Sequence, residues 1–315
     1  MVTGAGGFIG HHLVRFLKNK GYWVRGADIK HPEYSSKDEA DEFLLLDLRD
    51  FDNCVEATKS IDKVYNLAAN MGGIGFITDV KAEVMRDNAL INTHMLEASR
   101  LNGVKRAFYS SSACIYPIHK QEDPANTGLK EEDAYPANPD NEYGWEKLFS
   151  ERLYQNYRAD HGFETRIARY HNVFGPEGTY DGGREKAPAA ICRKVALAEH
   201  GDPIEIWGDG KQTRSFLYID DCLEGTYKLM ESDYAEPLNV GSDRLVTIDD
   251  MVDMVSKIAV KELKKVYLLD KPQGVRGRNS HNEKVRAALG WEPKISLEDG
   301  LKKTYQWIEG QIRQA

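Results

Sequence analysis

The chain of 315 residues has only four cysteines, and they are scattered without any C-x-x-C pair. This scatter argues against a disulfide scaffold and a structural zinc site, and it favours a reducing cytoplasm. No apolar run approaches ~20 residues, the length of a membrane-spanning helix. The first residues lack a basic segment followed by an apolar one, so no signal peptide is indicated.

Positive charge is also in short supply, with 42 Lys and Arg against 50 Asp and Glu, giving a net charge of -8. Nucleic acid is therefore not expected as the main partner, although local basic patches can still bind phosphate. Internal repeats and low-complexity segments are not found. The length exceeds that of a usual single domain and allows a large core.

The first half of the chain alternates short apolar runs with segments of helical period. The expected strands are 24–28, 43–47, 63–67 and 106–110, and the clearest helical segments are 12–20 and 88–101. Such alternation predicts an α/β fold with a parallel sheet covered on both faces. Several of these strands end in Asp, Asn or Ser, and ligands bind at the carboxyl ends of strands in such sheets.

The second half is less regular and is interrupted by prolines and glycine-rich turns. We expect residues 1–170 to form the first domain, with a return segment near 214–240 that reads as a strand followed by a helix. Residues 171–213 and 241–315 are expected to form a smaller domain that covers the substrate.

A glycine-rich loop opens the chain, with Gly4, Gly7 and Gly10 in a G-x-x-G-x-x-G pattern before a helical segment. Glycines at this spacing allow a tight turn and close approach of the backbone to a pyrophosphate, which the helix N-terminus attracts. An ordinary strand-to-helix turn is the alternative. Only three residues precede Gly4, so either the first strand is short or the natural chain begins earlier.

Two acidic residues follow this loop at the ends of expected strands. Asp28 lies 18 residues beyond Gly10, where a carboxylate accepts hydrogen bonds from a ribose 2′-hydroxyl and repels a 2′-phosphate. This position favours NAD over NADP, although Lys30 weakens the preference. Asp47 either contacts the adenine edge or caps a helix.

Tyr143 and Lys147 are four residues apart and share one face if their segment is helical. A nearby ammonium favours the phenolate, so we expect the tyrosine pKa to lie below its usual value of about 10. Such a tyrosine can take a proton from an alcohol while hydride leaves for a nicotinamide. The Y-x-x-x-K pattern alone occurs by chance in many chains, but the glycine loop gives it weight.

Four motifs in order, at 3–10, 66–69, 110–112 and 143–147, resemble the extended short-chain dehydrogenase/reductase family of nucleotide-sugar enzymes over essentially the whole chain. The resemblance implies a Rossmann-type, doubly wound NAD domain with a smaller α/β C-terminal domain that binds a sugar nucleotide. It also implies that Ser112 hydrogen-bonds the substrate. The cofactor contacts that it implies are Gly4, Gly7, Phe8, Ile9, Gly10, Asp28, Asp47, Leu67, Ala68, Ala69, Tyr143 and Lys147.

Five further stretches resemble a branch of this family that acts on GDP-sugars: 71–76, 111–117, 182–190, 207–215 and 274–279. The likeness implies transient oxidation of GDP-mannose at C4, inversion at C3 and C5, and reduction of C4 again. Cys114 and Lys186 are the implied acid/base pair on opposite sides of the ring. The implied substrate contacts are Gly72, Ser112, Cys114, Asn172, Glu185, Lys186, Lys194, Gln212, Arg214 and Arg276.

The chemistry explains why these residue types are needed. A ketone at C4 allows the carbanions at C3 and C5 to become enolates, and inversion then needs proton removal on one face and delivery on the other. Without the resemblance, Cys114 would be interpreted as a residue of the core and Lys186 as a surface lysine. Arg214, Arg276 and Arg278 lie in Gly-flanked loops and suit phosphate, although a surface ion pair is as plausible for each one alone.

Other functions remain open at this level. A nucleotide-sugar 4-epimerase or dehydratase of the same family would use Cys114 and Lys186 only to shape the pocket. A non-catalytic NAD-binding sensor could dispense with Tyr143, Lys147 and Ser112, all of which are present. The resemblance also implies a homodimer formed through 88–101 and 143–157, with a trimer or tetramer still open.

Overall fold

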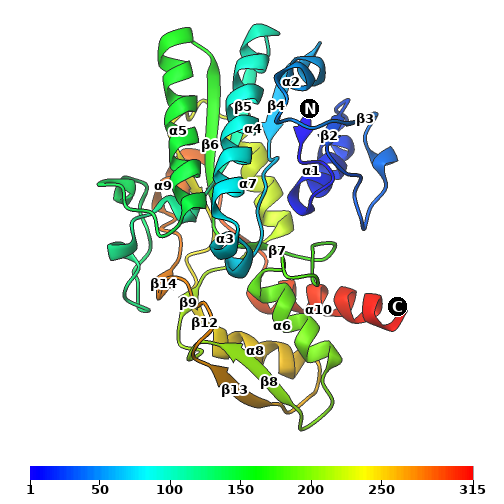
Figure 1. Cartoon of the computed structure of the whole chain (residues 1–315), viewed down its shortest axis with the longest axis vertical. Helices are drawn as coiled ribbons and strands as arrows, with labels where there is room; N and C mark the ends of the chain where they lie inside the picture. The colour runs from blue at the N-terminus through cyan, green and yellow to red at the C-terminus, as the bar shows by residue number, and fades with distance from the viewer. Residues whose placement is uncertain (315) are drawn as a thin grey trace.

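A parallel sheet of seven strands, in the order β11-β6-β5-β4-β1-β2-β3, organises the computed structural model, which describes residues 1–314 (Figure 1). The strands are β1 (Val2–Thr3), β2 (Arg25–Asp28), β3 (Glu42–Leu45), β4 (Lys63–Asn66), β5 (Arg106–Ser112), β6 (Glu164–Tyr170) and β11 (Leu238–Val240). The four strands predicted from the sequence are confirmed, with shifted ends. Because the order turns back at β1, the carboxyl ends of β1 and β4 border the crevice where such sheets bind ligands.

Helices cover both faces of this sheet, as the strand–helix alternation predicts. On one side α4 (Lys81–Leu101) packs against α2 (Phe51–Thr58) and α5 (Glu142–His161). On the other, α1 (Phe8–Asn19) packs against α7 (Ile219–Glu231). Separate hydrophobic clusters fill the two sides, one around Met95 and Tyr154 and the other around Leu13 and Leu223. The doubly wound α/β fold is therefore confirmed.

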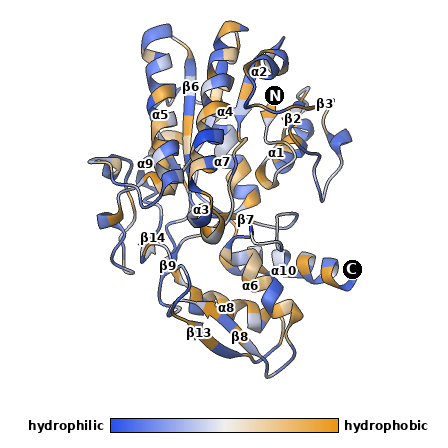
Figure 2. Ribbon diagram, in the orientation of Figure 1, coloured by the Kyte–Doolittle hydropathy of each residue, from blue (hydrophilic) through white to orange (hydrophobic). Residues whose placement is uncertain are grey.

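Elements from the second half of the chain form a smaller group at the lower end of the molecule (Figure 1). Helix α6 (Ala187–Leu197) packs against α8 (Ile248–Ile258) and α10 (Leu297–Gln314), beside the strand pair β8 (Pro203–Trp207) and β13 (Lys264–Leu268). Hydrophobic residues lie along α6 and α8 (Figure 2). The remaining elements are β7 (Val173–Phe174), β9 (Thr213–Arg214), β10 (Leu217–Tyr218), β12 (Val246–Thr247), β14 (Gly277–Arg278), α3 (Ile74–Asp79) and α9 (Glu283–Leu289).

The chain crosses between the two regions several times. After β6 it leaves the large sheet, and β10 and α7 lead back to β11, the seventh strand. This confirms the strand and helix expected between 215 and 230. None of the helices between residues 1 and 314 has the length and apolar character that a bilayer crossing requires.

Helix α5 is held close to the end of β5. The Asn141 side chain accepts a hydrogen bond from the Gly144 N–H at 2.9 Å and caps the helix N-terminus. A Cβ on Gly144 would lie 2.2 Å from the Cys114 carbonyl oxygen, so only glycine allows this approach. The packing places Tyr143 and Lys147 against the segment that contains Ser112 and Cys114.

Candidate active site

The glycine loop between β1 and α1 is shaped by contacts that exclude side chains. Gly4 has a φ of +67°, and a Cβ on Gly10 would lie 1.9 Å from the Gly4 carbonyl oxygen. Gly6, which lies outside the spaced pattern, is equally restricted, since its Cβ would lie 2.2 Å from the Lys30 carbonyl oxygen. The first turn of α1 has no side-chain cap. Its free N–H groups suit a phosphate.

Asp28 ends β2 beside this loop and is tied to it. Its carboxylate accepts hydrogen bonds from the N–H groups of Gly6, at 2.9 Å, and Lys30, at 3.1 Å. Burial raises the pKa of Asp28, and these two donors oppose that shift. An uncapped helix end, a crowded glycine turn and a carboxylate fixed beside it together fit the pyrophosphate and ribose of NAD.

In the structure, the partner of Asp47 is an arginine side chain and not the end of a helix. Its carboxylate forms an ion pair with Arg49 at 2.6 Å, and that side-chain hydrogen bond holds the Asp47 pKa below its ordinary value. The N-cap of α2 is Asp50. The helix-capping alternative for Asp47 is therefore wrong, because α2 begins at Phe51, four residues later.

The segment after β4 is fixed next to β1. The N–H groups of Leu67 and Ala68 donate to the Thr3 hydroxyl oxygen at 3.0 and 3.1 Å. Thr3 in turn donates to the Asn66 side-chain oxygen at 2.8 Å. Residues 67–69 therefore lie directly beside the glycine loop, at the crevice of the sheet.

Tyr143 and Lys147 share a buried face of α5, with exposed fractions of 6% and 1%. The Lys147 ammonium donates to the Ser110 carbonyl oxygen at 2.9 Å and lies 5.6 Å from the centre of the Tyr143 ring. Ser112 is near enough to hydrogen-bond the phenol, and this bond favours the phenolate. The two parts of the Y-x-x-x-K pattern and Ser112 therefore meet in one place.

The expected acidity of Tyr143 is wrong for the protein alone. Burial raises its pKa well above the ordinary value, and the charges of Cys114 and Glu146 raise it further. The Lys147 ammonium donates to the Ser110 carbonyl oxygen, and burial lowers the pKa of Lys147.

Cys114 lies half-buried just after β5, against a buried guanidinium. Its sulfur accepts a hydrogen bond from Arg278 Nη1 at 3.2 Å, and Arg278 also donates to Asp140 at 3.3 Å and to Gln121. Although burial disfavours the Arg278 cation, the charges of Cys114 and Asp140 raise its pKa. The guanidinium of Arg278 is thus engaged by the thiol, by Asp140 and by Gln121, and its suggested phosphate role stays a prediction.

Removal of this cation should make Cys114 less reactive. In Arg278→Gln we expect alkylation of Cys114 by iodoacetamide at neutral pH to slow by about tenfold, because the thiolate loses its stabilising charge. Mass spectrometry of the modified peptide measures the rate. Arg276→Gln is the matched control, since Arg276 pairs with Asp209 and not with the thiol. Equal rates in both variants would contradict the assigned contact.

Lys186 lies in the segment that packs against the loop before α3. Gly73 donates its N–H to the Arg184 carbonyl oxygen at 3.0 Å, and a Cβ on Gly73 would lie 2.3 Å from the Glu185 carbonyl oxygen. Burial lowers the pKa of Lys186, while the charges of Cys114 and Cys222 oppose that shift. Lys186 is therefore within electrostatic reach of Cys114.

The side chains around Lys186 are already engaged within the protein. Glu185 accepts a hydrogen bond from the Gly183 N–H at 2.7 Å. Gly72 lies beside Phe76, whose ring a Cβ at Gly72 would meet at 2.8 Å.

Arg214 is the arginine of the expected anion site that lacks a carboxylate partner among the described residues. Its guanidinium donates to the carbonyl oxygens of Thr213, at 2.8 Å, and Gln273, at 3.1 Å. Burial, with the neighbouring Arg278, lowers the pKa of Arg214 to about 9. Arg276 instead forms the ion pair with Asp209 that its sequence left open.

Three other expected substrate contacts lie between residues 172 and 212. The Asn172 amide donates to the Ser215 carbonyl oxygen at 2.9 Å, and Lys194 donates to that of Glu205 at 2.9 Å. Gln212 donates to the Trp207 carbonyl oxygen, while its own side-chain oxygen is buried without a partner among the described residues. That oxygen is free to accept a hydrogen bond from a ligand.

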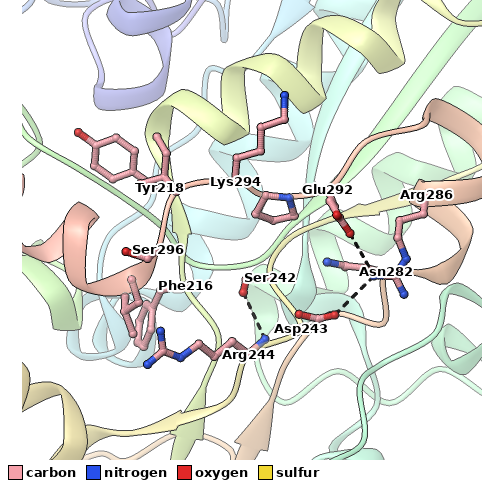
Figure 3. A pocket seen from close by; sticks show the side chains of 13 residues that line it. Phe216, Tyr218, Ser242, Asp243, Arg244, Asn282, Arg286, Glu292, Lys294 and Ser296 are labelled. Atoms are coloured by element: carbon pink, nitrogen blue, oxygen red, sulfur yellow. Dashed lines mark hydrogen bonds and ion pairs between the residues drawn. The ribbon is translucent and has the colours of Figure 1, made fainter.

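Two other features lie apart from these groups. His11, His12 and Glu177 have potential metal-binding atoms within 4.8 Å of one another, but Arg15 already pairs with the same Glu177 oxygen at 3.1 Å, and burial lowers the pKa of both histidines. A cavity of about 210 Å³ lies between the loop after β11 and the start of α10 (Figure 3). None of the expected site residues lines it.

Residues 1–241 match the NAD dependent epimerase/dehydratase family, so the chain belongs to this family. Over 312 residues the chain is 50% identical to GDP-mannose 3,5-epimerase of Arabidopsis thaliana, which covers 99% of this chain and 82% of that protein. It is 30% identical to UDP-glucuronate 4-epimerase of Thermodesulfobacterium geofontis, over 99% of this chain and 96% of that protein. These relatives confirm the predicted enzyme class and the family's cofactor, NAD.

Solved structures agree. UDP-glucose 4-epimerase of Thermotoga maritima, determined with UDP-glucose, superposes with a TM-score of 0.89 at 26% identity, covering 99% of this chain and 98% of the other. The Rossmann-type fold expected from the glycine loop is confirmed.

Proposed function

We propose that this protein is an NAD-dependent GDP-mannose 3,5-epimerase. The observation that carries the proposal is the second pair of proton-transfer groups, Cys114 and Lys186, because Cys114 is within electrostatic reach of both Tyr143 and Lys186. A 4-epimerase needs only the tyrosine and its helpers. A thiol paired with a guanidinium is a group prepared for proton removal.

NAD, when bound, accepts hydride from C4 and later returns it, so that no external redox partner is needed. We infer that Asp28 binds the adenosine ribose and that the free N–H groups of α1 hold the pyrophosphate. Residues 67–69 and Asp47 would line the rest of the dinucleotide. Lys147 would bind the nicotinamide ribose.

Tyr143 takes the proton of the C4 hydroxyl in this proposal. Its phenolate becomes accessible when a positive charge lies beside it, and the hydrogen bond from Ser112 contributes in the same direction. The Ser112 oxygen accepts the Cys114 N–H at 3.1 Å, and its one hydrogen would turn from the phenol to the substrate when the sugar binds. That hydrogen would stabilise the new carbonyl oxygen at C4.

Cys114 and Lys186 carry out the inversion. The C–H bond next to the ketone breaks, its proton goes to the Cys114 sulfur, and the electron pair becomes an enolate. Lys186, whose pKa burial lowers, delivers a proton to the same carbon from the other face. Exchange of the thiol and amine protons with water then resets both groups, so solvent hydrogen enters the sugar.

Residues 171–213 and 241–315 are proposed as the substrate domain. Arg214, a half-buried cation without a carboxylate partner among residues 1–314, would bind the diphosphate, and Lys194 would add a second charge. The Gln212 side-chain oxygen, which has no partner among the described residues, would accept a hydrogen bond from the GDP, and Asn172 would contribute a second polar contact. Arg276 could bind the diphosphate only if its ion pair with Asp209 were broken.

We also propose a homodimer in the cytoplasm. Helices α4 and α5 pack side by side and expose Met85, Leu90, Trp145 and Phe149, which is apolar surface suited to a second copy. Sedimentation would give a monomer if this is wrong.

Incubation with GDP-mannose in D2O tests the reaction. We expect NMR to show deuterium at C3 and C5 of the sugar, while hydrogen at C4 is retained because hydride transfer returns it. Exchange at neither carbon, together with inversion at C4, would identify a 4-epimerase instead. A sensor would produce no sugar change and no transient reduced nicotinamide.

A further inference from the structure

Glu146, between the two residues of the Y-x-x-x-K pattern, is a buried carboxylate that the proposed chemistry does not use. It lies on α5 with 1% of its surface exposed. One oxygen accepts hydrogen bonds from Asn92 and from Ser150, each at 2.7 Å. The other oxygen has no partner within the described residues. An uncompensated buried carboxylate is costly, so its position calls for a physical explanation.

The neighbouring Lys147 is a buried positive charge that also lacks a direct ionic partner among the described residues. Its buried ammonium makes one hydrogen bond, to the Ser110 carbonyl oxygen, and no ion pair with the described residues. Burial lowers the pKa of Lys147, and Glu146 is the leading group that opposes this effect. Glu151 also opposes it, but its carboxylate is already paired with Arg169 at 2.8 Å.

The charge of Glu146 reaches the other side chains around the pair. It raises the pKa values of Tyr143, Tyr109 and Tyr154, as a buried negative charge near a phenol must. Helix α4 contributes only the uncharged Asn92 to the carboxylate itself. The charged or titratable groups around Glu146 are Tyr143, Lys147, Glu151 and Tyr154 on α5, Tyr109 on β5, Cys114 after β5 and Arg169 on β6.

The carboxylate is also fixed relative to the cofactor loop. Asn92 accepts a hydrogen bond from Asn66 at 3.0 Å, and Asn66 accepts one from Thr3 at 2.8 Å. Thr3 precedes the glycine loop and holds the segment after β4. A chain of uncharged hydrogen bonds thus joins Glu146 to the crevice of the sheet without neutralising it.

We propose that Glu146 is the buried counter-charge of the Tyr143–Lys147 pair, a positioning residue that keeps Lys147 an ammonium and sets the pH range in which the pair works. The part that concerns catalysis rests on the proposed function. The part that concerns the charge of Lys147 is a property of the protein itself.

Glu146→Gln isolates this charge. The glutamine oxygen can accept both hydrogen bonds, from Asn92 and Ser150, so the change removes the charge at nearly constant shape. NMR of ¹³Cε-labelled lysine in the purified protein follows Lys147, with its signal assigned by Lys147→Arg. We expect Lys147 to lose its proton about one pH unit lower in Glu146→Gln than in the wild type, because a buried cation without its counter-charge is less stable.

The pH dependence of solvent exchange into the sugar gives a second result. Loss of the negative charge makes the Tyr143 phenolate easier to form and the Lys147 ammonium harder to keep. Both limbs of the profile are therefore expected to move to lower pH. Ser150→Ala is the matched control: it removes one hydrogen bond to the same oxygen but keeps the charge, and it should leave both limbs in place.

Several outcomes would overturn the proposal. One is that Lys147 titrates at the same pH in the wild type and in Glu146→Gln. If Glu146→Gln does not fold, the ¹³Cδ signal of Glu146 in the wild type, assigned by Glu146→Asp, decides instead, and a protonated carboxyl at neutral pH rejects the idea. If the wild type exchanges no sugar hydrogen, the proposed function fails, while the titration of Lys147 still decides the role of Glu146.

Discussion

Cys114→Ala is expected to abolish exchange of sugar hydrogen with solvent at C3 or C5 while NAD stays bound. The change removes the group that takes the carbon-bound proton, and general acid/base groups contribute about 10²–10⁴-fold to such steps. NMR of GDP-mannose after incubation in D2O measures the loss. Oxidation at C4 should continue, so the reduced-nicotinamide absorbance should still appear when sugar is added.

The control for this variant is another buried thiol. Cys54 lies on α2, far in sequence from Cys114 and Lys186, and donates to the Leu48 carbonyl oxygen. Cys54→Ser keeps a donor there and should exchange hydrogen at the wild-type rate. Wild-type exchange in Cys114→Ala would refute the role given to Cys114.

Tyr143→Phe is expected to stop both steps. The phenyl ring fills the same buried space, so the fold should persist, but the C4 hydroxyl loses the group that accepts its proton. We expect oxidation to fall by about 10²–10⁴-fold. Because the ketone is what makes C3 and C5 acidic, solvent exchange must fall with it. Stopped-flow absorbance of reduced nicotinamide and NMR in D2O measure the two losses.

Tyr109→Phe is the matched control for this second variant. Its ring also faces the Lys147 ammonium, at 4.8 Å from the ring centre, and it is equally buried. We expect it to keep most of the activity. A Tyr143→Phe protein that still reduces bound NAD would show that another base acts at C4.

Some features of the site depend on residues that are close in the sequence, and others depend on residues that are far apart along the chain. The strands follow from the pattern of apolar residues, which is local, and the meeting of Tyr143 with Lys147 follows from their spacing once the segment is helical. The contact of Arg278 with Cys114 joins residues 164 positions apart. A guanidinium between glycines reads as a phosphate ligand until packing shows which neighbour it meets.

Burial explains most of the other differences. The pKa of Tyr143 was expected to fall because of Lys147, but the sequence does not show how completely the phenol is removed from water. Gly6 is another example, since only the path of the chain near Lys30 makes a side chain there impossible. Asp50 replaces Asp47 as a helix cap because α2 begins later than the end of β3 indicates.

The missing side chain of Gly144 has a consequence for how the two steps depend on each other. Helix α5, which carries Tyr143, packs directly on the carbonyl oxygen of Cys114 at Gly144. Any shift of one group is therefore passed to the other. The proposed oxidation at C4 and the proposed inversion therefore both depend on this one contact, and a larger residue at Gly144 is expected to impair both steps.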